Sequence, residues 1–179
     1  MSLVGFKARN HPQQKTNPKV DERATAPEFF APLHERFRFT IDVAATAENT
    51  KCERFYSIED DGLAQSWAGE RVWCNPPYSN IEPWIEKAAL SPAELVVMLL
   101  PANRTEQGWW QRNIEPHRDR SVTPMRVEFL PGRVRFIAPG ADGIGPNERP
   151  PFGCCLVIWT ARALAPPADK HENATKEEK

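Results

Sequence analysis

The sequence predicts an α/β fold with an open, mostly parallel sheet that ends in an antiparallel pair of strands. Short strand-like runs alternate with helix-like segments between residues 25 and 114. This alternation is typical of parallel sheets whose strands are joined by helices. Two further strand-like runs, at 125–137 and 151–159, follow one another without a helical pattern between them.

The first half of the pattern begins with a short helix over EFFAPLHERF. Thr25 offers a capping hydroxyl and Pro27 suits the first turn, so we expect the helix to begin there. The β-branched and aromatic residues of FRFTIDVAA predict a buried strand that ends near Asp42. A second, weaker strand is expected at CERFYSI.

The second half begins with RVWC, a short strand that Pro76 and Pro77 stop, because proline cannot donate to a sheet. Apolar residues at helical spacing predict a helix over IEPWIEKAAL. The continuous apolar run ELVVMLLP predicts a central strand that is covered on both faces. TEQGWWQRNI is expected to form another helix, with Trp109 and Trp110 in the core.

The ends of the chain lack such patterns. Residues 1–20 are polar and are expected to be flexible, and residues 164–179 are expected to be a disordered tail. A single domain is predicted over residues 21–163, with a long Gly- and Pro-rich loop at 138–150.

Composition excludes several classes of protein. The chain has 179 residues, with 23 Lys and Arg against 24 Asp and Glu, so attraction by bulk positive charge is excluded as the basis of DNA binding. The N-terminus shows no secretion signal, and no apolar run approaches the ~20 residues of a membrane helix. We therefore expect a protein without a membrane partner, in the cytoplasm.

The four cysteines show neither the C-x-x-C spacing of a zinc site nor partner histidines. No metal and no disulfide are expected. Cys74 is expected to be a core residue, which excludes a cysteine nucleophile of the kind that methylates cytosine carbon.

Charge is distributed unevenly along the chain. Residues 41–99 contain ten acidic and four basic residues, whereas residues 100–140 contain seven arginines and four acidic residues. Arginine favours forked contacts with phosphate or guanine. Scattered surface charge is an equally good interpretation of this pattern alone.

The motif Asn75-Pro76-Pro77-Tyr78 follows a predicted strand and precedes a predicted helix. The Asn75 side-chain oxygen and the Pro76 carbonyl can accept two hydrogen bonds from one planar NH2 group. Such a pair of acceptors favours a pyramidal nitrogen with an available lone pair. Tyr78 offers a face on which a base can stack. A proline-rich turn with Tyr78 packed inward is the structural alternative.

These residues resemble the NPPY motif of the amino-methyltransferases that act on DNA. Over roughly residues 21–159 the chain is similar to the phage N-6-adenine methyltransferase (Dam-type) family, through ATAPEFFAPL, FRFTIDVAATAENTKCERFYSIEDDGLAQSW, RVWCNPPYS, VVMLLPANRT, VEFLPGRVRF and CCLVIW. The resemblance implies a Rossmann-like methyltransferase fold, S-adenosylmethionine as cofactor, and a bacterial host cytoplasm. It further implies double-stranded DNA as the partner, with the target adenine flipped into the pocket of Asn75, Pro76, Pro77 and Tyr78.

The resemblance also suggests where the methyl donor binds. It places Asp42, Ala44 and Ala45 in the loop that holds the methionine part of the donor, and Asp42 could pair with the ammonium group. This loop lacks the glycines found in many amino-methyltransferases. Asp61 corresponds to a residue that binds the donor adenine, with Glu59 and Asp60 as competitors, and the segment Thr25–Pro27 resembles one that closes over the donor. Capping roles or solvated turns are the alternatives for these residues.

DNA contacts are assigned to arginines, because the 33-residue gap between Asp42 and Asn75 leaves no room for a recognition domain. Phosphate contact is a safer expectation than base recognition. The candidates are Arg112, Arg118, Arg120, Arg126, Arg133 and Arg135, together with the 138–151 loop.

Two other functions remain open. The same motif could act on another planar amine, in an RNA base or a protein glutamine, and the glycine-free loop could mark an inactive DNA-binding relative. The recognition sequence cannot be derived from these residues, and a monomer is favoured.

Overall fold

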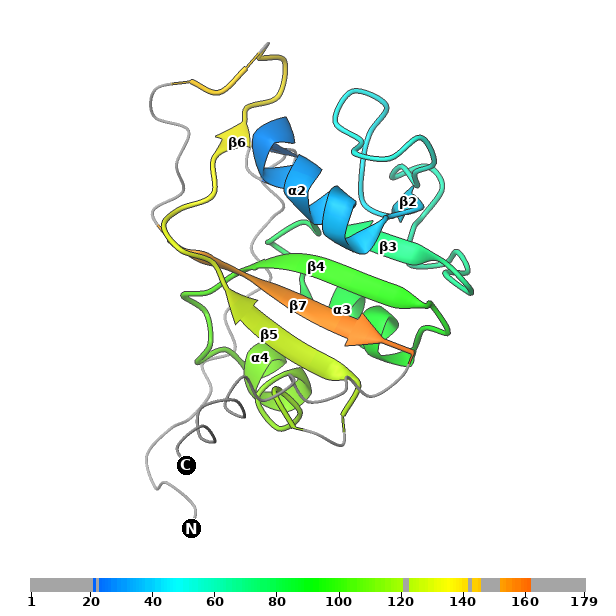
Figure 1. The fold of residues 1–179 in the computed structure, drawn as a ribbon, viewed down its shortest axis with the longest axis vertical. Helices are drawn as coiled ribbons and strands as arrows, with labels where there is room; N and C mark the ends of the chain where they lie inside the picture. The colour runs from blue at the N-terminus through cyan, green and yellow to red at the C-terminus, as the bar shows by residue number, and fades with distance from the viewer. Residues whose placement is uncertain (1–20, 22, 121–122, 142, 146–151, 162–179) are drawn as a thin grey trace, which may run out of the picture.

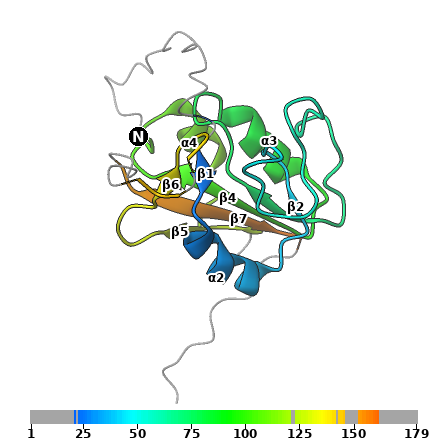
Figure 2. The same ribbon diagram turned by 90° about the horizontal axis from the view of Figure 1, so that it is seen from above.

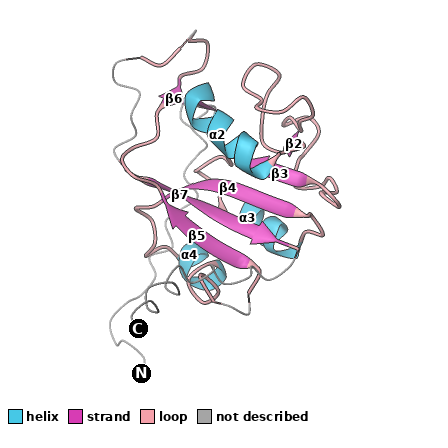
Figure 3. Ribbon diagram, in the orientation of Figure 1, coloured by secondary structure: helices cyan, strands magenta, loops and turns pink. Residues whose placement is uncertain are grey.

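A computed structural model of the chain describes residues 21, 23–120, 123–141, 143–145 and 152–161. They form three layers, with one sheet between helices on both of its faces (Figures 1 and 2). The elements in chain order are β1 (Ala24–Thr25), α2 (Pro27–Phe37), β2 (Ile41–Asp42), β3 (Arg71–Cys74), α3 (Glu82–Leu90), β4 (Leu95–Pro101), α4 (Gly108–Asn113), β5 (Met125–Phe129), β6 (Phe136–Ile137) and β7 (Cys154–Thr160). Figure 3 distinguishes them from the long loops that join them.

The main sheet has the strand order β2-β3-β4-β7-β5. β2, β3 and β4 pair in parallel, whereas β7 pairs antiparallel with both β4 and β5. The predicted α/β class is therefore confirmed, but the mostly parallel sheet is not, because half of the pairings are antiparallel and the sheet is mixed. An apolar run such as CCLVIWT has the same pattern in either direction, so the sequence did not reveal that β7 inserts between β4 and β5.

Strand β4 lies at the centre of the core, as predicted from its continuous apolar run. Val96, Met98 and Leu100 belong to the cluster beneath α3 and α4, and the alternate residues Leu95, Val97 and Leu99 pack on the opposite face. All six are buried. Because β4 is buried on both faces, it is held rigidly in the core. The loops at the ends of the neighbouring strands are therefore held in fixed positions.

The helices cover the two faces with aromatic side chains. On one face, Phe30 of α2 packs edge-on against Trp73, with 5.4 Å between the ring centroids. On the other face, Trp109 and Trp110 of α4 are buried, as predicted. The edge-to-face arrangement is a favourable geometry for aromatic pairs and fixes how α2 lies on the sheet.

Several predicted elements are shorter than their sequence patterns. The strand expected over FRFTIDVAA consists only of β2, and CERFYSI contributes a single isolated bridge between Asp42 and Phe55. The run at 125–137 is divided into β5 and β6 by a turn in which Gly132 has φ 72°. Glycine adopts this left-handed conformation at little cost, so the chain can leave the sheet there.

The expected cap of the first helix is also different. Helix α2 begins at Pro27 as predicted, but Ala26 occupies the N-cap position without a side-chain hydrogen bond. Thr25 instead belongs to β1 and pairs with Phe136 of β6. This two-stranded sheet lies near the end of the main sheet where β2, β3 and β4 finish (Figure 2).

The expected flexible segment 1–20 and tail 164–179 lie outside the described residues, as does part of the 138–151 loop. Within the described part of the chain, no helix is long and apolar enough to cross a membrane.

Candidate functional site

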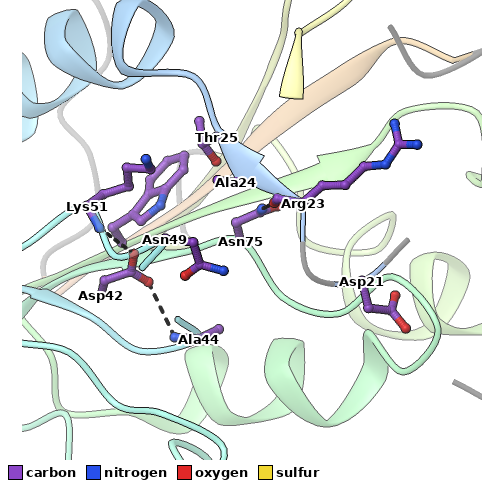
Figure 4. A pocket seen from close by; sticks show the side chains of 10 residues that line it. Asp21, Arg23, Ala24, Thr25, Asp42, Ala44, Asn49, Lys51 and Asn75 are labelled. Atoms are coloured by element: carbon purple, nitrogen blue, oxygen red, sulfur yellow. Dashed lines mark hydrogen bonds between the residues drawn. The ribbon is translucent and has the colours of Figure 1, made fainter. Parts of the chain in front are cut away.

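A small polar pocket lies at the carboxyl ends of β2 and β3. Asp42 ends β2 and pairs with Trp73 across the parallel ladder, and Asn75 follows β3 directly. The space inside the pocket that could hold solvent or part of a ligand is about 20 Å³. Its lining comes from three separate stretches of chain (Figure 4): Asp21, Arg23, Ala24, Thr25, Asp42, Ala44, Asn49, Lys51, Trp73 and Asn75.

One polar atom of the Asn75 side-chain amide makes a hydrogen bond within the protein, and the other does not. Its Nδ2 donates to the carbonyl oxygen of Arg23 at 3.4 Å, while Oδ1 is buried and has no hydrogen-bond partner among the described residues. Buried acceptors are nearly always paired, so an unpaired amide oxygen that lines a pocket indicates a place for an N–H donor of a ligand.

The two prolines fix the backbone after Asn75. The carbonyl oxygen of Pro77 accepts from the Asn80 N–H at 3.1 Å, which closes a turn. No backbone hydrogen bond to the Pro76 carbonyl is found within the described ranges. The carbonyl of Pro76 thus lacks a backbone donor among these residues, but Pro76 is buried and, like Pro77 and Tyr78, does not line the pocket that contains Asn75.

The Tyr78 side chain is half-buried rather than fully exposed to solvent. Its hydroxyl donates to the carbonyl oxygen of Leu99 at 3.3 Å, and its ring lies 6.1 Å from the ring of Phe152. Burial raises the pKa of the phenol well above its usual value. Arg104 donates to the carbonyl oxygen of Tyr78 at 3.0 Å. The inward packing that the sequence offered as an alternative is thus partly realised, with the hydroxyl fixed on β4.

Asp42 is a buried carboxylate with 3% of its surface exposed. It accepts from the backbone N–H groups of Lys51 at 3.0 Å and Ala44 at 3.4 Å. Burial raises the pKa of Asp42 to about 6, against the effect of these two hydrogen bonds. No helix follows Asp42, so the N-cap alternative is wrong, and the carboxylate instead closes its own loop.

The loop after Asp42 is held by its own side chains and by a glycine from elsewhere. Ala45 is buried and Ala44 half-buried, and Asn49 Oδ1 accepts from the Thr46 N–H at 2.7 Å. A Cβ at Gly62 would collide with the carbonyl oxygen of Val43. Gly62, which the sequence analysis missed, therefore allows its turn to pack directly against the backbone of the loop after Asp42.

Asp61 precedes that glycine and lies outside the pocket lining. It is exposed, with φ 52°, and its carboxylate makes no hydrogen bond to another residue in the described part of the chain. Its two competitors have partners within the turn, because Asp60 accepts from the Ser57 backbone N–H at 2.8 Å and shares the single proton of the Ser57 hydroxyl with Glu59. This arrangement leaves Asp61 as the acidic side chain of this turn that is free to bind a ligand.

The segment before α2 crosses the Asn75 loop. Thr25 has 2% of its surface exposed and lines the pocket, whereas Pro27 is exposed and does not. Asp21 accepts from both the N–H and the hydroxyl of Ser79, at 3.2 and 2.7 Å. Asp21 and Arg23 were missed because contacts between distant segments leave no pattern in the sequence. Asn49 and Lys51 could have been found from their place in the loop after Asp42.

The predicted DNA-binding arginines fall into two groups. Arg112 bonds Glu82 at 2.6 Å, Arg118 pairs with Glu115 and Asp119, and Arg126 pairs with Glu128. Arg126 shares Glu128 with Arg36 of α2, so it lies on the α2 face of the sheet. Arg120 is exposed in the segment between α4 and β5.

The second group lies beside α2. Arg133 and Arg135 are exposed and line a groove of about 900 Å³, partly open to solvent, whose floor includes Phe29, Leu130 and Val134. Arg135 donates to the carbonyl oxygen of Gly145 at 3.4 Å. Arg133 has no ion pair with any residue that the structure describes, so its charge is available to a partner.

The cysteines occupy the core. Cys74, Cys154 and Cys155 are buried, Cys52 is half-buried, and all four are free thiols. Burial raises the pKa of Cys74 well above its usual value, so the thiol is not a nucleophile. No group of three or more His, Cys, Asp or Glu side chains that could hold a metal is found among the described residues.

Comparisons with known proteins agree with the motif. The family described as DNA N-6-adenine-methyltransferase (Dam) matches residues 13–167. A DNA N-6-adenine-methyltransferase of Escherichia phage T1 is 37% identical over 86 residues, 46% of this chain and 36% of the relative. One of Haemophilus phage HP1 (strain HP1c1) is 35% identical over 105 residues, 56% of this chain and 60% of the relative. The chain thus covers less than two thirds of either relative.

Proposed function

Because the chain belongs to the DNA N-6-adenine-methyltransferase (Dam) family, we propose that it methylates N6 of adenine in double-stranded DNA. S-adenosylmethionine is the proposed methyl donor. The proposed setting is a bacterial host cytoplasm, with a phage or prophage as the source of the enzyme, and the proposed working form is a monomer.

The observation that carries this proposal is the unpartnered, buried Oδ1 of Asn75. An adenine amine presents two N–H donors in one plane, and Asn75 Oδ1 with the Pro76 carbonyl would accept both. The bond from Nδ2 to Arg23 supports this role because it keeps the amide oxygen directed into the pocket. Tyr78 and Pro77 complete the proposed catalytic motif, with the Tyr78 ring as the stacking surface for a flipped base.

The residues at the pocket fit the methionine end of S-adenosylmethionine. Asp42 supplies a buried carboxylate for an α-ammonium group, and the small side chain of Ala44 lines the pocket beside it. Ala45 is buried outside this lining, so its proposed role is to support the loop. When bound, S-adenosylmethionine would supply the methyl group: the S–CH3 bond would break as the N–C bond forms, S-adenosylhomocysteine would leave, and the proton lost from the amine would pass to solvent. Thr25 and Asp61 are proposed as further donor contacts, while the exposed position of Pro27 favours a role in starting α2.

The enclosed space of the pocket, about 20 Å³, is far smaller than the ~300–1,000 Å³ of typical ligand sites, so the donor cannot enter unless the lining moves. Asp21, Arg23, Ala24 and Thr25 form one wall of the pocket. We therefore expect this segment to shift when the donor enters, with the hydrogen bond from Asn75 to Arg23 as the contact that changes.

DNA is proposed to lie along the groove of Arg133 and Arg135, where unpaired positive charge meets an apolar floor. Arg112 and Arg118 already pair with carboxylates of the chain, so their contribution is expected to be smaller. Arg120 is proposed as an outer phosphate contact. Phosphate contacts position a duplex without specifying its sequence.

The test is methyl transfer from labelled S-adenosylmethionine to unmethylated duplex DNA, followed by nucleoside analysis. Label in N6-methyladenine is expected, and Asn75→Ala should lower kcat by about 1,000-fold, the size of effect seen when one positioned polar group is lost from an active site. Asn80→Ala is the matched control, because Asn80 is an exposed asparagine of the same loop.

Other outcomes separate the alternatives. Label in RNA or in glutamine side chains, with none in DNA, would replace adenine by another planar amine. DNA binding without donor binding would identify an inactive relative instead.

A further inference from the structure

Lys51 and Asp42 place opposite charges on one pocket; the two charges influence each other, but their side chains are not in direct contact. The backbone N–H of Lys51 donates to the Asp42 carboxylate at 3.0 Å, which brings the two residues together. Their side chains form no ion pair within 4 Å, and both line the same pocket (Figure 4). The pocket therefore presents a carboxylate and a neighbouring ammonium group, each able to take an external partner.

An α-amino acid is the ligand class that complements this arrangement. It carries an ammonium and a carboxylate on one carbon, so one group can face Asp42 and the other can face Lys51. We propose that Lys51 binds the α-carboxylate of the methyl donor while Asp42 binds its α-ammonium. This inference rests on the proposed function and adds a residue that neither the motif nor the loop resemblance assigned.

The burial of the Lys51 side chain supports the proposal that a ligand carboxylate supplies its counter-charge. The side chain is half-buried, and desolvation lowers the pKa of its ammonium group, opposed by the charge of Asp42. The carboxylate of a bound ligand would offset the desolvation cost of Lys51 more effectively than Asp42 does, because the Asp42 carboxylate already accepts hydrogen bonds from backbone N–H groups.

Asn49 adds hydrogen-bond donors to the same pocket lining. Its Oδ1 accepts from the Thr46 N–H at 2.7 Å, which fixes the orientation of the amide. Its Nδ2 makes no hydrogen bond to another residue within the described ranges. Asn49 lines the pocket, so these N–H groups can assist Lys51 in holding a carboxylate.

The other cation of the pocket is Arg23, and its side chain extends away from Asp42 and Lys51 (Figure 4). In an α-amino acid whose ammonium group binds Asp42, the carboxylate carbon lies only about two bonds from the ammonium nitrogen. Lys51 is therefore the better placed of the two cations.

The test uses calorimetric binding of three nucleosides to the full chain. S-adenosylhomocysteine carries both charged groups, decarboxylated S-adenosylmethionine keeps the ammonium, and 5′-methylthioadenosine lacks both. Lys51→Met is expected to weaken S-adenosylhomocysteine by 10- to 100-fold, the range for a hydrogen bond to a charged group. Binding of the two ligands without a carboxylate should change less than threefold. Lys51→Arg should restore part of the loss.

Lys87→Met is the matched control, because it removes one lysine charge from α3 outside the pocket. Equal weakening of all three ligands by Lys51→Met would show a structural role and overturn the proposal, as would unchanged binding of S-adenosylhomocysteine. If Lys51→Met does not fold, the wild-type preference for S-adenosylhomocysteine over the decarboxylated donor decides, and its absence overturns the proposal. Failure of the wild type to bind any of the three would instead refute the proposed function.

Discussion

The hydroxyl of Ser79 donates a 2.7 Å hydrogen bond to the carboxylate of Asp21, a residue 58 positions earlier in the chain. The Ser79 N–H donates to the same carboxylate at 3.2 Å. Together with the bond from Asn75 to the Arg23 carbonyl, this pair fixes the segment before α2 on the Asn75 loop. The orientation of the Asn75 amide thus depends on a contact that lies outside the motif itself.

Ser79→Ala and Asp21→Ala are each expected to lower kcat about tenfold, because either change loosens the segment that orients Asn75. A tenfold loss corresponds to ~1.4 kcal/mol of activation free energy. The free energy of unfolding should change by less than ~1 kcal/mol, since the pair is exposed. Single-turnover methylation and denaturant unfolding measure the two effects.

A double-mutant cycle checks that the two residues act as a pair. The double variant should be no slower than either single variant, whereas independent effects would multiply to about a hundredfold. Asn80→Ala, the exposed neighbour, should match the wild type.

Asp42 is expected to make stability and donor binding depend on pH in opposite directions. Its pKa is raised from 3.8 to about 6 by burial, so the folded state holds the extra proton between these values. The free energy of unfolding attributable to Asp42 should fall by roughly 3 kcal/mol as pH rises from 4 to above 6. Donor affinity should rise over the same range, because only the ionised carboxylate attracts an ammonium group.

The free energy of unfolding and the donor affinity are each measured for the wild type and for Asp42→Asn at the same pH. The difference between the two proteins cancels the effects of the other carboxylates. Unfolding and S-adenosylhomocysteine binding are followed from pH 4.5 to 8. Parallel pH profiles for the two proteins would contradict the assignment of the raised pKa to Asp42.

Gly62→Ala is expected to destabilise the fold by ~1–3 kcal/mol, the usual cost of overpacking. The added methyl group would collide with the Val43 carbonyl oxygen and displace the loop that carries Ala44 and Ala45. Donor affinity should therefore fall more than DNA affinity. Gly143→Ala is the control, since a Cβ there meets nothing within 4 Å; a Gly62→Ala protein with normal stability and donor binding would refute the close approach.

Arg133→Ala is expected to weaken duplex binding equally for all sequences and to reduce the salt dependence of log K by about one. Arg133 is exposed, whereas Arg112 is already paired with Glu82 at 2.6 Å. Arg112→Ala should therefore have the smaller effect. Fluorescence anisotropy between 50 and 200 mM salt compares the DNA affinities of the two variants. A larger loss of affinity in Arg112→Ala would show that DNA binds on the α4 side and not along the groove of Arg133.

Tyr78 should tolerate the loss of its hydroxyl better than the loss of its ring. Tyr78→Phe removes the bond to Leu99 and is expected to cost about 1 kcal/mol of stability with little change in activity. Tyr78→Ala should reduce base flipping, seen as a weaker 2-aminopurine fluorescence increase, while donor binding is retained. Equal loss of both would exclude the stacking role.

The features that the sequence predicted well depend on local patterns. The apolar run of β4 predicted a strand buried on both faces, and the prolines after Asn75 predicted the end of β3. Pairing partners were predicted less well, because the position of β7 between β4 and β5 depends on distant contacts. The division of the 125–137 run into β5 and β6 depends on the backbone conformation of a single residue, Gly132.

The same distinction holds for the site. Asn75 and Asp42 stand at strand ends, where a pattern can be recognised, and the structure brings both to one pocket. Asp21 and Gly62 act through contacts with residues far away in the chain. Such contacts are set by packing, which one sequence does not reveal.

The ladder between β1 and β6 has a thermodynamic consequence. Thr25, which lines the donor pocket, pairs with Phe136, which follows Arg133 and Arg135 in the chain. If the proposed donor site and DNA groove are correct, a shift of β1 that admits one ligand would move the segment that faces the other, because the two strands are hydrogen-bonded. The two binding equilibria are then linked, and whatever factor the donor exerts on DNA affinity, DNA must exert on donor affinity.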